Sequence, residues 1–169
     1  MELRGLKTLF LLRHAKSSWA DEDLADIERP LKERGRKAAA TIGRFLRKER
    51  VNPDLVLSSC AVRARETIDI VLKAAKLRTE IRYDERIYEA SPLRLLEVIL
   101  QIDSDRKSVL LVGHNPGMEE LLQLLTGNVE HMPTAALAKI ALKTSKWSGV
   151  GARKGTLEWF VKPKELQDI

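Results

Sequence analysis

The chain has 169 residues, of which 44% are hydrophobic and 32% are charged. This composition is typical of a folded globular protein and excludes general disorder. The net charge of +6 favours an anionic partner, but an aromatic content of 5% argues against a base-stacking surface, so we expect no nucleic acid partner. A single cysteine, Cys60, excludes an internal disulfide, and no apolar run suits a signal peptide or a bilayer span. We therefore expect a cytoplasmic protein with no membrane partner.

The first half of the chain alternates a short apolar run with a longer segment of helical period, twice. A near-continuous apolar run at 8–12 predicts a strand that is buried on both faces, and the segment 31–48 predicts a helix. A second strand is predicted at 55–57. It is followed by a helix at 62–76, whose apolar residues fall on one face.

The same alternation continues in the next part of the chain. A short third strand is predicted at 80–83 and a helix at 92–100, with a proline that the first helical turn tolerates. The apolar run at 108–112 predicts a fourth strand. The segment 118–125 predicts a helix for which Gly127 is the candidate C-cap.

Two further strands are predicted at 136–142 and 156–161, separated by a glycine-rich turn. They can form an antiparallel hairpin at one edge of the sheet. Strands that alternate with helices predict an α/β fold with a mainly parallel sheet. Because we find no repeat and no linker-like segment, we expect residues 1–169 to form a single domain.

The predicted parallel strands end on side chains that are suited to bind phosphate. The first strand leads into Arg13 and His14, the second into two serines and then Arg63, and the fourth into Gly113 and His114. In open α/β sheets, ligands bind beyond the carboxyl ends of the strands. We therefore expect these arginines and histidines, far apart in sequence, to share one pocket.

Each of these residue types has a distinct role in phosphoryl transfer. A neutral imidazole is a good nucleophile, so His14 is the candidate to attack phosphorus and to become transiently phosphorylated. Arg13 and Arg63 offer planar forks of donors that match phosphate oxygens. His114 is expected near a helix N-terminus, where it would bind and orient the phosphoryl group.

Four segments resemble the histidine phosphatase (phosphoglycerate mutase-like) superfamily. Residues 12–15 (Leu-Arg-His-Ala) resemble its Arg-His-Gly signature, residues 58–67 its second motif, and residues 112–116 its second-histidine motif. Residues 29–31 (Arg-Pro-Leu), followed by Gly35, resemble a segment of the compact SixA branch, the phosphohistidine phosphatases. The matches follow the family order and cover most of the chain.

The resemblance implies a fold, an activity and a substrate. The fold would be a phosphoglycerate mutase-like, three-layer sandwich with helices on both faces of the sheet. The activity would be that of a phosphohydrolase with a phosphohistidine intermediate and no cofactor. The substrate would be a protein phosphorylated on histidine, or alternatively a small phosphate ester.

Some positions depart from the family pattern or have no firm assignment. Ala15 replaces the usual glycine, and Lys32 replaces a threonine that could cap the following helix. Glu85 is the closest match to the glutamate that protonates an alcohol leaving group in other members, although the compact branch often lacks this acid. Ser17 and Trp19 follow His14 closely and are candidate substrate-binding residues, with packing roles as the alternative.

Other classes of protein fit the sequence less well. A cysteine phosphatase needs an arginine six residues after its cysteine, but Glu66 stands six residues after Cys60. The three histidines show no metal-binding spacing, so we expect no metal site. A non-catalytic module that binds phosphate or nucleic acid stays open as an alternative, as does a small-molecule phosphatase or mutase. His131, Trp147 and the oligomeric state receive no assignment.

Overall fold

The computed structural model describes residues 6–166. Six strands form one sheet in the order β3-β2-β4-β1-β5-β6. Strands β1 to β4 are parallel where they pair, whereas β5 pairs antiparallel with both β1 and β6. The strands are β1 (Thr8–Arg13), β2 (Leu55–Ser58), β3 (Glu80–Tyr83), β4 (Ser108–Gly113), β5 (Leu137–Leu142) and β6 (Gly155–Val161). The mainly parallel sheet and the antiparallel edge hairpin are thus confirmed.

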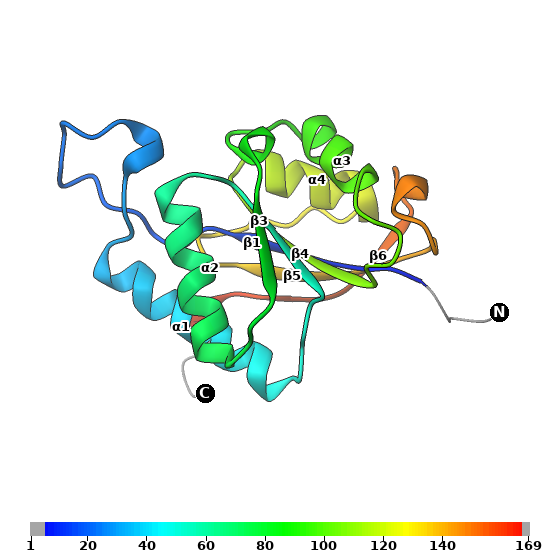
Figure 1. The fold of residues 1–169 in the computed structure, drawn as a ribbon, viewed down its shortest axis with the longest axis horizontal. Coiled ribbons are helices and arrows are strands. Elements are labelled where there is room, and N and C mark those ends of the chain that lie inside the picture. The colour runs from blue at the N-terminus through cyan, green and yellow to red at the C-terminus, as the bar shows by residue number, and fades with distance from the viewer. Residues whose placement is uncertain (1–5, 167–169) are drawn as a thin grey trace.

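Helices cover both faces of this sheet, which gives the predicted three layers (Figure 1). On one face α1 (Glu33–Lys48) packs against α2 (Val62–Ala75). On the other face α3 (Pro92–Leu100) packs against α4 (Gly117–Thr126). None of the helices in the described part of the chain is long and apolar enough to cross a membrane.

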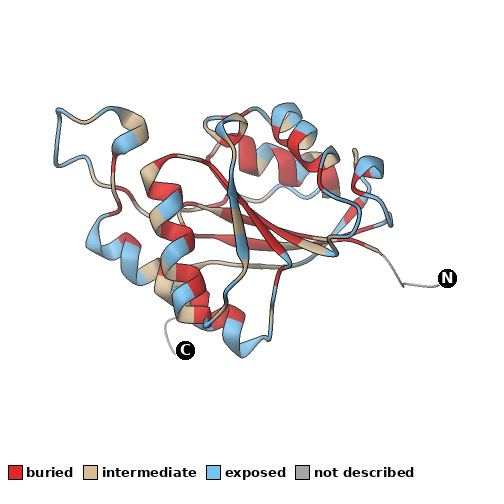
Figure 2. Ribbon diagram, viewed as in Figure 1, coloured by how far each residue is buried: buried red, intermediate tan, exposed pale blue. Residues whose placement is uncertain are grey.

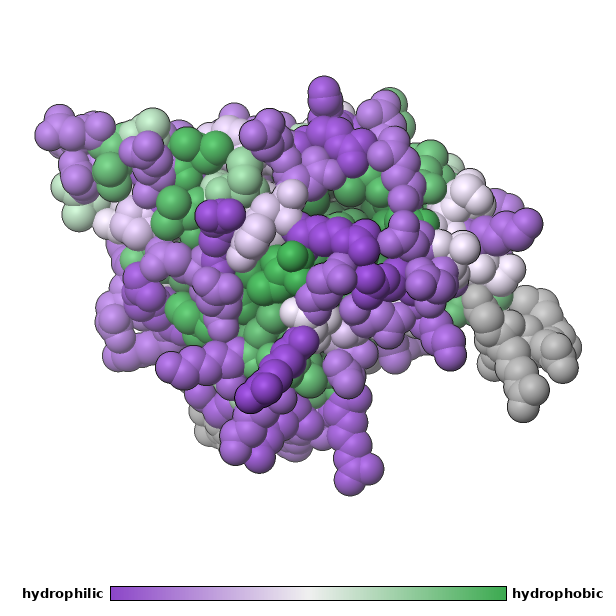
Figure 3. All heavy atoms as spheres, in the orientation of Figure 1, coloured by the Kyte–Doolittle hydropathy of each residue, from purple (hydrophilic) through white to green (hydrophobic). Residues whose placement is uncertain are grey.

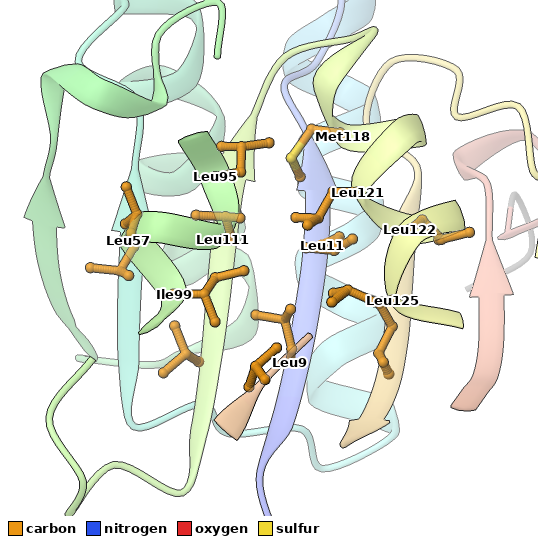
Figure 4. Close-up of a cluster of buried hydrophobic side chains, with 14 of the residues drawn as sticks. Leu9, Leu11, Leu57, Leu95, Ile99, Leu111, Met118, Leu121, Leu122 and Leu125 are labelled. Atoms are coloured by element: carbon orange, nitrogen blue, oxygen red, sulfur yellow. The ribbon is translucent and has the colours of Figure 1, made fainter. Parts of the chain in front are cut away.

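Strand β1 shows why the sheet needs helices on both sides. Its side chains alternate between the two faces, as the pleat of a strand requires. Leu9 and Leu11 pack in the core beneath α3 and α4, whereas Phe10 and Leu12 pack in the core beneath α1 and α2. Figure 2 shows the buried sheet between layers whose outer faces are exposed, and Figure 4 shows the first of the two cores. In the view of Figure 3, polar and charged side chains cover most of the surface.

The predicted boundaries hold to within two residues, and the largest shift is at α1, which begins at Glu33 instead of Leu31. Leu31 forms an isolated antiparallel bridge with Ser17 instead of the first helical turn. Lys32 takes the N-cap position and makes no side-chain capping bond, as the missing threonine implied. Residues between β1 and α1 form a long loop that contains one short 3-10 turn, η1 (Asp26–Glu28). This loop extends beyond the sheet (Figure 1).

Candidate active site

The carboxyl ends of β1, β2 and β4 lie side by side. Arg13 pairs with Gly113 across β1 and β4, and Ser58 pairs with Val112 across β2 and β4. The main chain continues the sheet for one more step, because the His14 nitrogen donates to the Gly113 carbonyl oxygen at 3.1 Å. The register of three strands therefore sets the positions of the residues that follow them.

A pocket of about 190 Å³ opens at this edge of the sheet. Its lining includes Arg13, His14, Arg63 and His114, so the structure brings together the four residues that the strand ends predicted. The rings of His14 and His114 lie with centroids 5.0 Å apart. This placement fits the expectation of one shared pocket; the chemical roles of the four residues stay predictions.

His14 is held in one orientation. Its side chain is buried, with 7% of the residue exposed, and its Nδ1 lies 2.7 Å from the Ala15 carbonyl oxygen. A carbonyl oxygen only accepts, so Nδ1 carries the hydrogen and Nε2 keeps its lone pair. Burial, together with the nearby Arg63 and Arg13, lowers the pKa of His14 to about 4. His14 is therefore neutral near pH 7.

Ala15, whose carbonyl oxygen fixes the His14 ring, is itself held by α2. The Ala15 nitrogen donates to Thr67 Oγ1 at 2.9 Å, and the Thr67 hydroxyl donates to the Arg63 carbonyl oxygen at 2.6 Å. Both Thr67 and Ala15 are fully buried. Residues 58–67, the second sequence motif, thus supply Arg63 and also hold the first motif, residues 12–15, in place through hydrogen bonds.

His114 is also buried and neutral. Its Nε2 lies 2.7 Å from Ser59 Oγ, which also accepts a hydrogen bond from the Ala61 nitrogen. This arrangement favours donation from the Ser59 hydroxyl to Nε2, with the imidazole hydrogen on Nδ1. That Nδ1 is buried and has no hydrogen-bond partner among the described residues. Burial and then the proximity of His14 lower the pKa of His114 to about 3.

The two predicted arginines are anchored by main-chain oxygens and keep unpaired donors. Arg13 Nη1 donates to the Met132 carbonyl oxygen at 2.9 Å, and Arg63 Nη1 donates to the Asp26 carbonyl oxygen at 2.7 Å. The Nε atoms of Arg13 and Arg63 are buried without a hydrogen-bond partner in residues 6–166. Buried donors without partners are costly and uncommon, so their concentration here indicates a site built for an oxygen-rich ligand.

The loop between β1 and α1 contributes residues that sequence reasoning missed. Asp26 accepts hydrogen bonds from Arg63 Nη2 at 3.0 Å, from Arg29 Nε at 3.1 Å and from the Tyr88 hydroxyl. Tyr88 and then Arg63 and Arg29 hold the pKa of this carboxyl at about 2. Tyr88 also packs edge-on against His114. The family-like segment 29–31 could have indicated Arg29, but no sequence pattern singled out Asp26.

Ser17 and Trp19 both line the pocket, in agreement with the expectation that they lie at the site. Ser17 is buried and accepts a hydrogen bond from Arg29 Nη1 at 2.8 Å. Trp19 is 70% exposed, and the Arg29 guanidinium lies over its ring at 3.5 Å from the centroid. Arg29 thereby links Ser17 and Trp19 within the loop. Its guanidinium forms a positively charged wall of the pocket.

The expected acid, Glu85, does not line the pocket. It begins the 3-10 turn η2 (Glu85–Ile87), which buries Ile87 and leaves Glu85 exposed. The carboxylate that lines the pocket is Glu89, whose backbone adopts a left-handed conformation with φ of 49°. Glu85 therefore lies outside the pocket lining, and its assignment as the acid stays a prediction.

The remaining unassigned residues lie elsewhere. Trp147 is buried and donates from Nε1 to the Arg106 carbonyl oxygen at 2.7 Å, so it packs in the core. His131 is exposed and pairs with Glu119 at 2.7 Å. Within residues 6–166 no group of three or more histidine, cysteine or carboxylate side chains is placed to hold a metal ion.

The comparisons with known proteins agree on one family. Residues 9–92 match the histidine phosphatase superfamily (branch 1). An uncharacterized protein of Mycobacterium tuberculosis is 32% identical over 148 residues, which cover 88% of this chain and 89% of the relative. An uncharacterized chloroplastic protein of Arabidopsis thaliana is 29% identical over 162 residues, or 90% of this chain and 74% of the relative.

Solved structures agree in fold. SixA from Agrobacterium tumefaciens, a protein assigned as a phosphohistidine phosphatase, superposes with a TM-score of 0.80 at 32% identity, over 93% of this chain and 98% of its own. A protein histidine phosphatase SixA in complex with tungstate superposes with a TM-score of 0.81 at 22% identity, over 94% and 99%, which shows the shared fold. The chain therefore belongs to branch 1 of the histidine phosphatase superfamily.

Proposed function

We propose that this protein is a phosphohydrolase that carries the phosphoryl group transiently on His14, and that its substrate is a protein phosphorylated on histidine. The observation that supports this most directly is the state of His14, which is buried, neutral and fixed through Nδ1 beside positively charged groups. A nucleophilic imidazole needs an unprotonated Nε2 with a fixed direction of attack. A cytoplasmic location is part of the proposal.

The reaction has two displacement steps at phosphorus. The His14 Nε2 lone pair attacks, a P–N bond forms, and the P–N bond to the substrate imidazole breaks as that imidazole gains a proton. Water then attacks the phosphorus on His14, the new P–N bond breaks, and inorganic phosphate and neutral His14 are released. Arg13, Arg63 and His114 would hold the phosphoryl oxygens throughout, where positioned cations and donors stabilise charge.

The position of Glu85 favours a nitrogen leaving group. A leaving imidazole is basic and can take its proton from solvent, whereas a leaving alkoxide needs a positioned acid. Glu85, which the family pattern marks for that role, is exposed outside the pocket. The similarity to SixA from Agrobacterium tumefaciens supports the same choice of substrate.

Glu89 favours a second candidate function, a small-molecule phosphomonoesterase. Its carboxylate lines the pocket, where it could protonate an alcohol leaving group. This function would share the phosphorylated His14 and differ in the acid. The two functions are separated by comparing free phosphohistidine and phosphohistidine protein with sugar phosphates, in wild type and in Glu89→Gln. Sugar phosphate turnover that depends on Glu89, without activity on phosphohistidine, would select the esterase.

The mechanism is tested by trapping the adduct. The protein is mixed with a ³²P-labelled phosphohistidine protein and quenched within milliseconds. We expect a label on His14 that survives alkali and is lost in acid. His14→Ala should form no adduct and lose turnover by at least about a thousandfold, as expected for a nucleophile.

Two matched variants control for general effects of substituting a nucleophilic side chain. His131→Gln changes an exposed histidine, and Cys60→Ser removes the only thiol; both should keep the adduct and the rate. Unchanged turnover in His14→Ala would refute the proposal. Binding of phosphoprotein with no turnover in the wild type would instead support a non-catalytic module.

A further inference from the structure

A second groove lies beside the proposed catalytic pocket, at the same edge of the sheet. Its volume is about 330 Å³, and its wall shares Lys16 and Thr134 with the pocket. The groove continues across the start of α1, through Arg34, to the residues that follow β6, Lys162 and Lys164.

The topology explains why these segments meet. Strand β5 runs antiparallel to β1, and β6 runs antiparallel to β5. Leu137 therefore pairs both with Leu12 near the end of β1 and with Val161 at the end of β6. Residues that follow β1, precede β5 and follow β6 all emerge at the edge where His14 lies.

The lining of this groove combines an apolar floor with positive charge. The apolar part comes from Ala38 and from the rings of Pro133 and Pro163. Four of the eight lining residues are cations and none is a carboxylate; the cations are Lys16, Arg34, Lys162 and Lys164. Within residues 6–166 none of these four cations has an ion-pair partner. We call this surface the basic groove.

We propose that the basic groove docks an acidic segment of the phosphorylated protein substrate. An apolar side chain of that segment would enter the groove, and its carboxylates would pair with the surrounding cations. The inference rests on the proposed function, since it places the phosphohistidine of the same segment in the adjoining pocket across Lys16 and Thr134. Complementary charge of this kind steers association and selects partners.

Two observations favour an acidic polypeptide over other anions. Single-stranded nucleic acids are held by aromatic side chains on which bases stack, and no aromatic residue lines the basic groove. A small phosphate ester would fill the catalytic pocket and leave the groove empty. A polypeptide is long enough to occupy both at once, and an apolar anchor with flanking charges is a common pattern of peptide recognition.

The test compares two phosphohistidine peptides. One carries a leucine and three glutamates after the phosphohistidine, and the other carries glutamines in place of the glutamates. The variant Lys162→Glu/Lys164→Glu reverses two charges of the basic groove. The control Arg94→Glu/Lys107→Glu makes the same change in charge on exposed residues: Arg94 lies in α3, on the far face of the sheet, and Lys107 precedes β4, at the opposite edge.

We expect the wild type to prefer the acidic peptide by about tenfold in kcat/KM, which corresponds to about 1.4 kcal/mol. The groove variant should lose this preference while its activity on the glutamine peptide stays unchanged, and the control variant should keep it. Because surface charges are screened by salt, the wild-type preference should shrink as ionic strength rises.

The outcomes separate this inference from the proposed function. Equal activity of the wild type on both peptides, or an equal loss on both in the groove variant, would overturn the docking proposal alone. Absence of turnover on either peptide would count against the proposed function. In that case, binding of the labelled acidic peptide to the His14→Ala protein is measured by fluorescence anisotropy, with and without the groove substitutions. An oligonucleotide that displaces the peptide, or a dimer that buries the groove, would also overturn it.

Discussion

The two buried histidines of the site should make the protein lose stability as the pH falls from 7 to 4.5. Both imidazoles have an ordinary pKa of 6.5, and in the folded protein the pKa of His14 is about 4 and that of His114 about 3. Between pH 6.5 and 4 the unfolded chain therefore binds protons that the native protein does not. Acidification then favours unfolding, and stability is full only above about pH 6.5.

The size of the effect follows from the difference in pKa. At about 1.36 kcal/mol for each pKa unit, an imidazole that is protonated only when unfolded costs about 2 to 3 kcal/mol at pH 4.5. Two such groups cost about 5 kcal/mol together. That is a large part of the roughly 5–15 kcal/mol that stabilises a typical domain. The carboxyl of Asp26, whose folded pKa is about 2, adds a loss only below about pH 4.

The assay is urea unfolding followed by tryptophan fluorescence at a series of pH values. The wild type is compared with His14→Gln/His114→Gln, because His14 contributes to the lowered pKa of His114 and the single variants are coupled. The readout is the change in the free energy of unfolding between pH 7 and 4.5, so a general loss of stability in the variant does not matter. Parallel curves for the two proteins would refute the reasoning.

Two further predictions concern the loop between β1 and α1 and its close contact with the start of α1. Asp26→Ala removes the carboxylate that ties this loop to α2 and to η2, and should accelerate limited proteolysis within the loop, whereas Asp23→Ala, at an exposed position in the same loop, should not. In Gly35→Ala the new Cβ would lie 2.2 Å from the Lys16 carbonyl oxygen, so we expect a loss of about 1–3 kcal/mol in the free energy of unfolding. Gly151→Ala meets no atom within 4 Å and should have no effect or stabilise by up to about 1 kcal/mol, as chemical denaturation would show.

The fold was predictable because the pattern of apolar residues reports burial directly. Residues 9–12 of β1 and 109–112 of β4 are apolar without interruption, which indicates strands that are covered on both faces. Once parallel strands are expected, the rule that ligands lie beyond their carboxyl ends brings Arg13, His14 and His114 to one edge. Local sequence and general topology are sufficient for that inference.

The loop residues of the site were not predictable in this way. Asp26 lies in a segment without periodicity, and its importance arises from contacts with Arg63 and Tyr88, at sequence separations of 37 and 62 residues. Glu89 lines the pocket and has a left-handed backbone, a conformation that is uncommon for a residue other than glycine and that no sequence pattern here predicted. Sequence reasoning therefore chose Glu85, which matches the family pattern and lies outside the pocket.

The charges around the pocket connect its stability with its proposed chemistry. The charged groups that line the pocket, or that bind its arginines directly, are Arg13, Lys16, Arg29, Arg63, Glu89 and Asp26. With both histidines neutral, these four cations and two carboxylates leave two positive charges, which is the charge that a phosphoryl dianion neutralises. Asp26 offsets the repulsion between two of the arginines when no ligand is bound, and enough positive charge remains to attract the substrate. Burial and the same guanidinium groups lower the pKa of His14, so in the proposed function one arrangement would both keep the nucleophile neutral and bind the anion that it attacks.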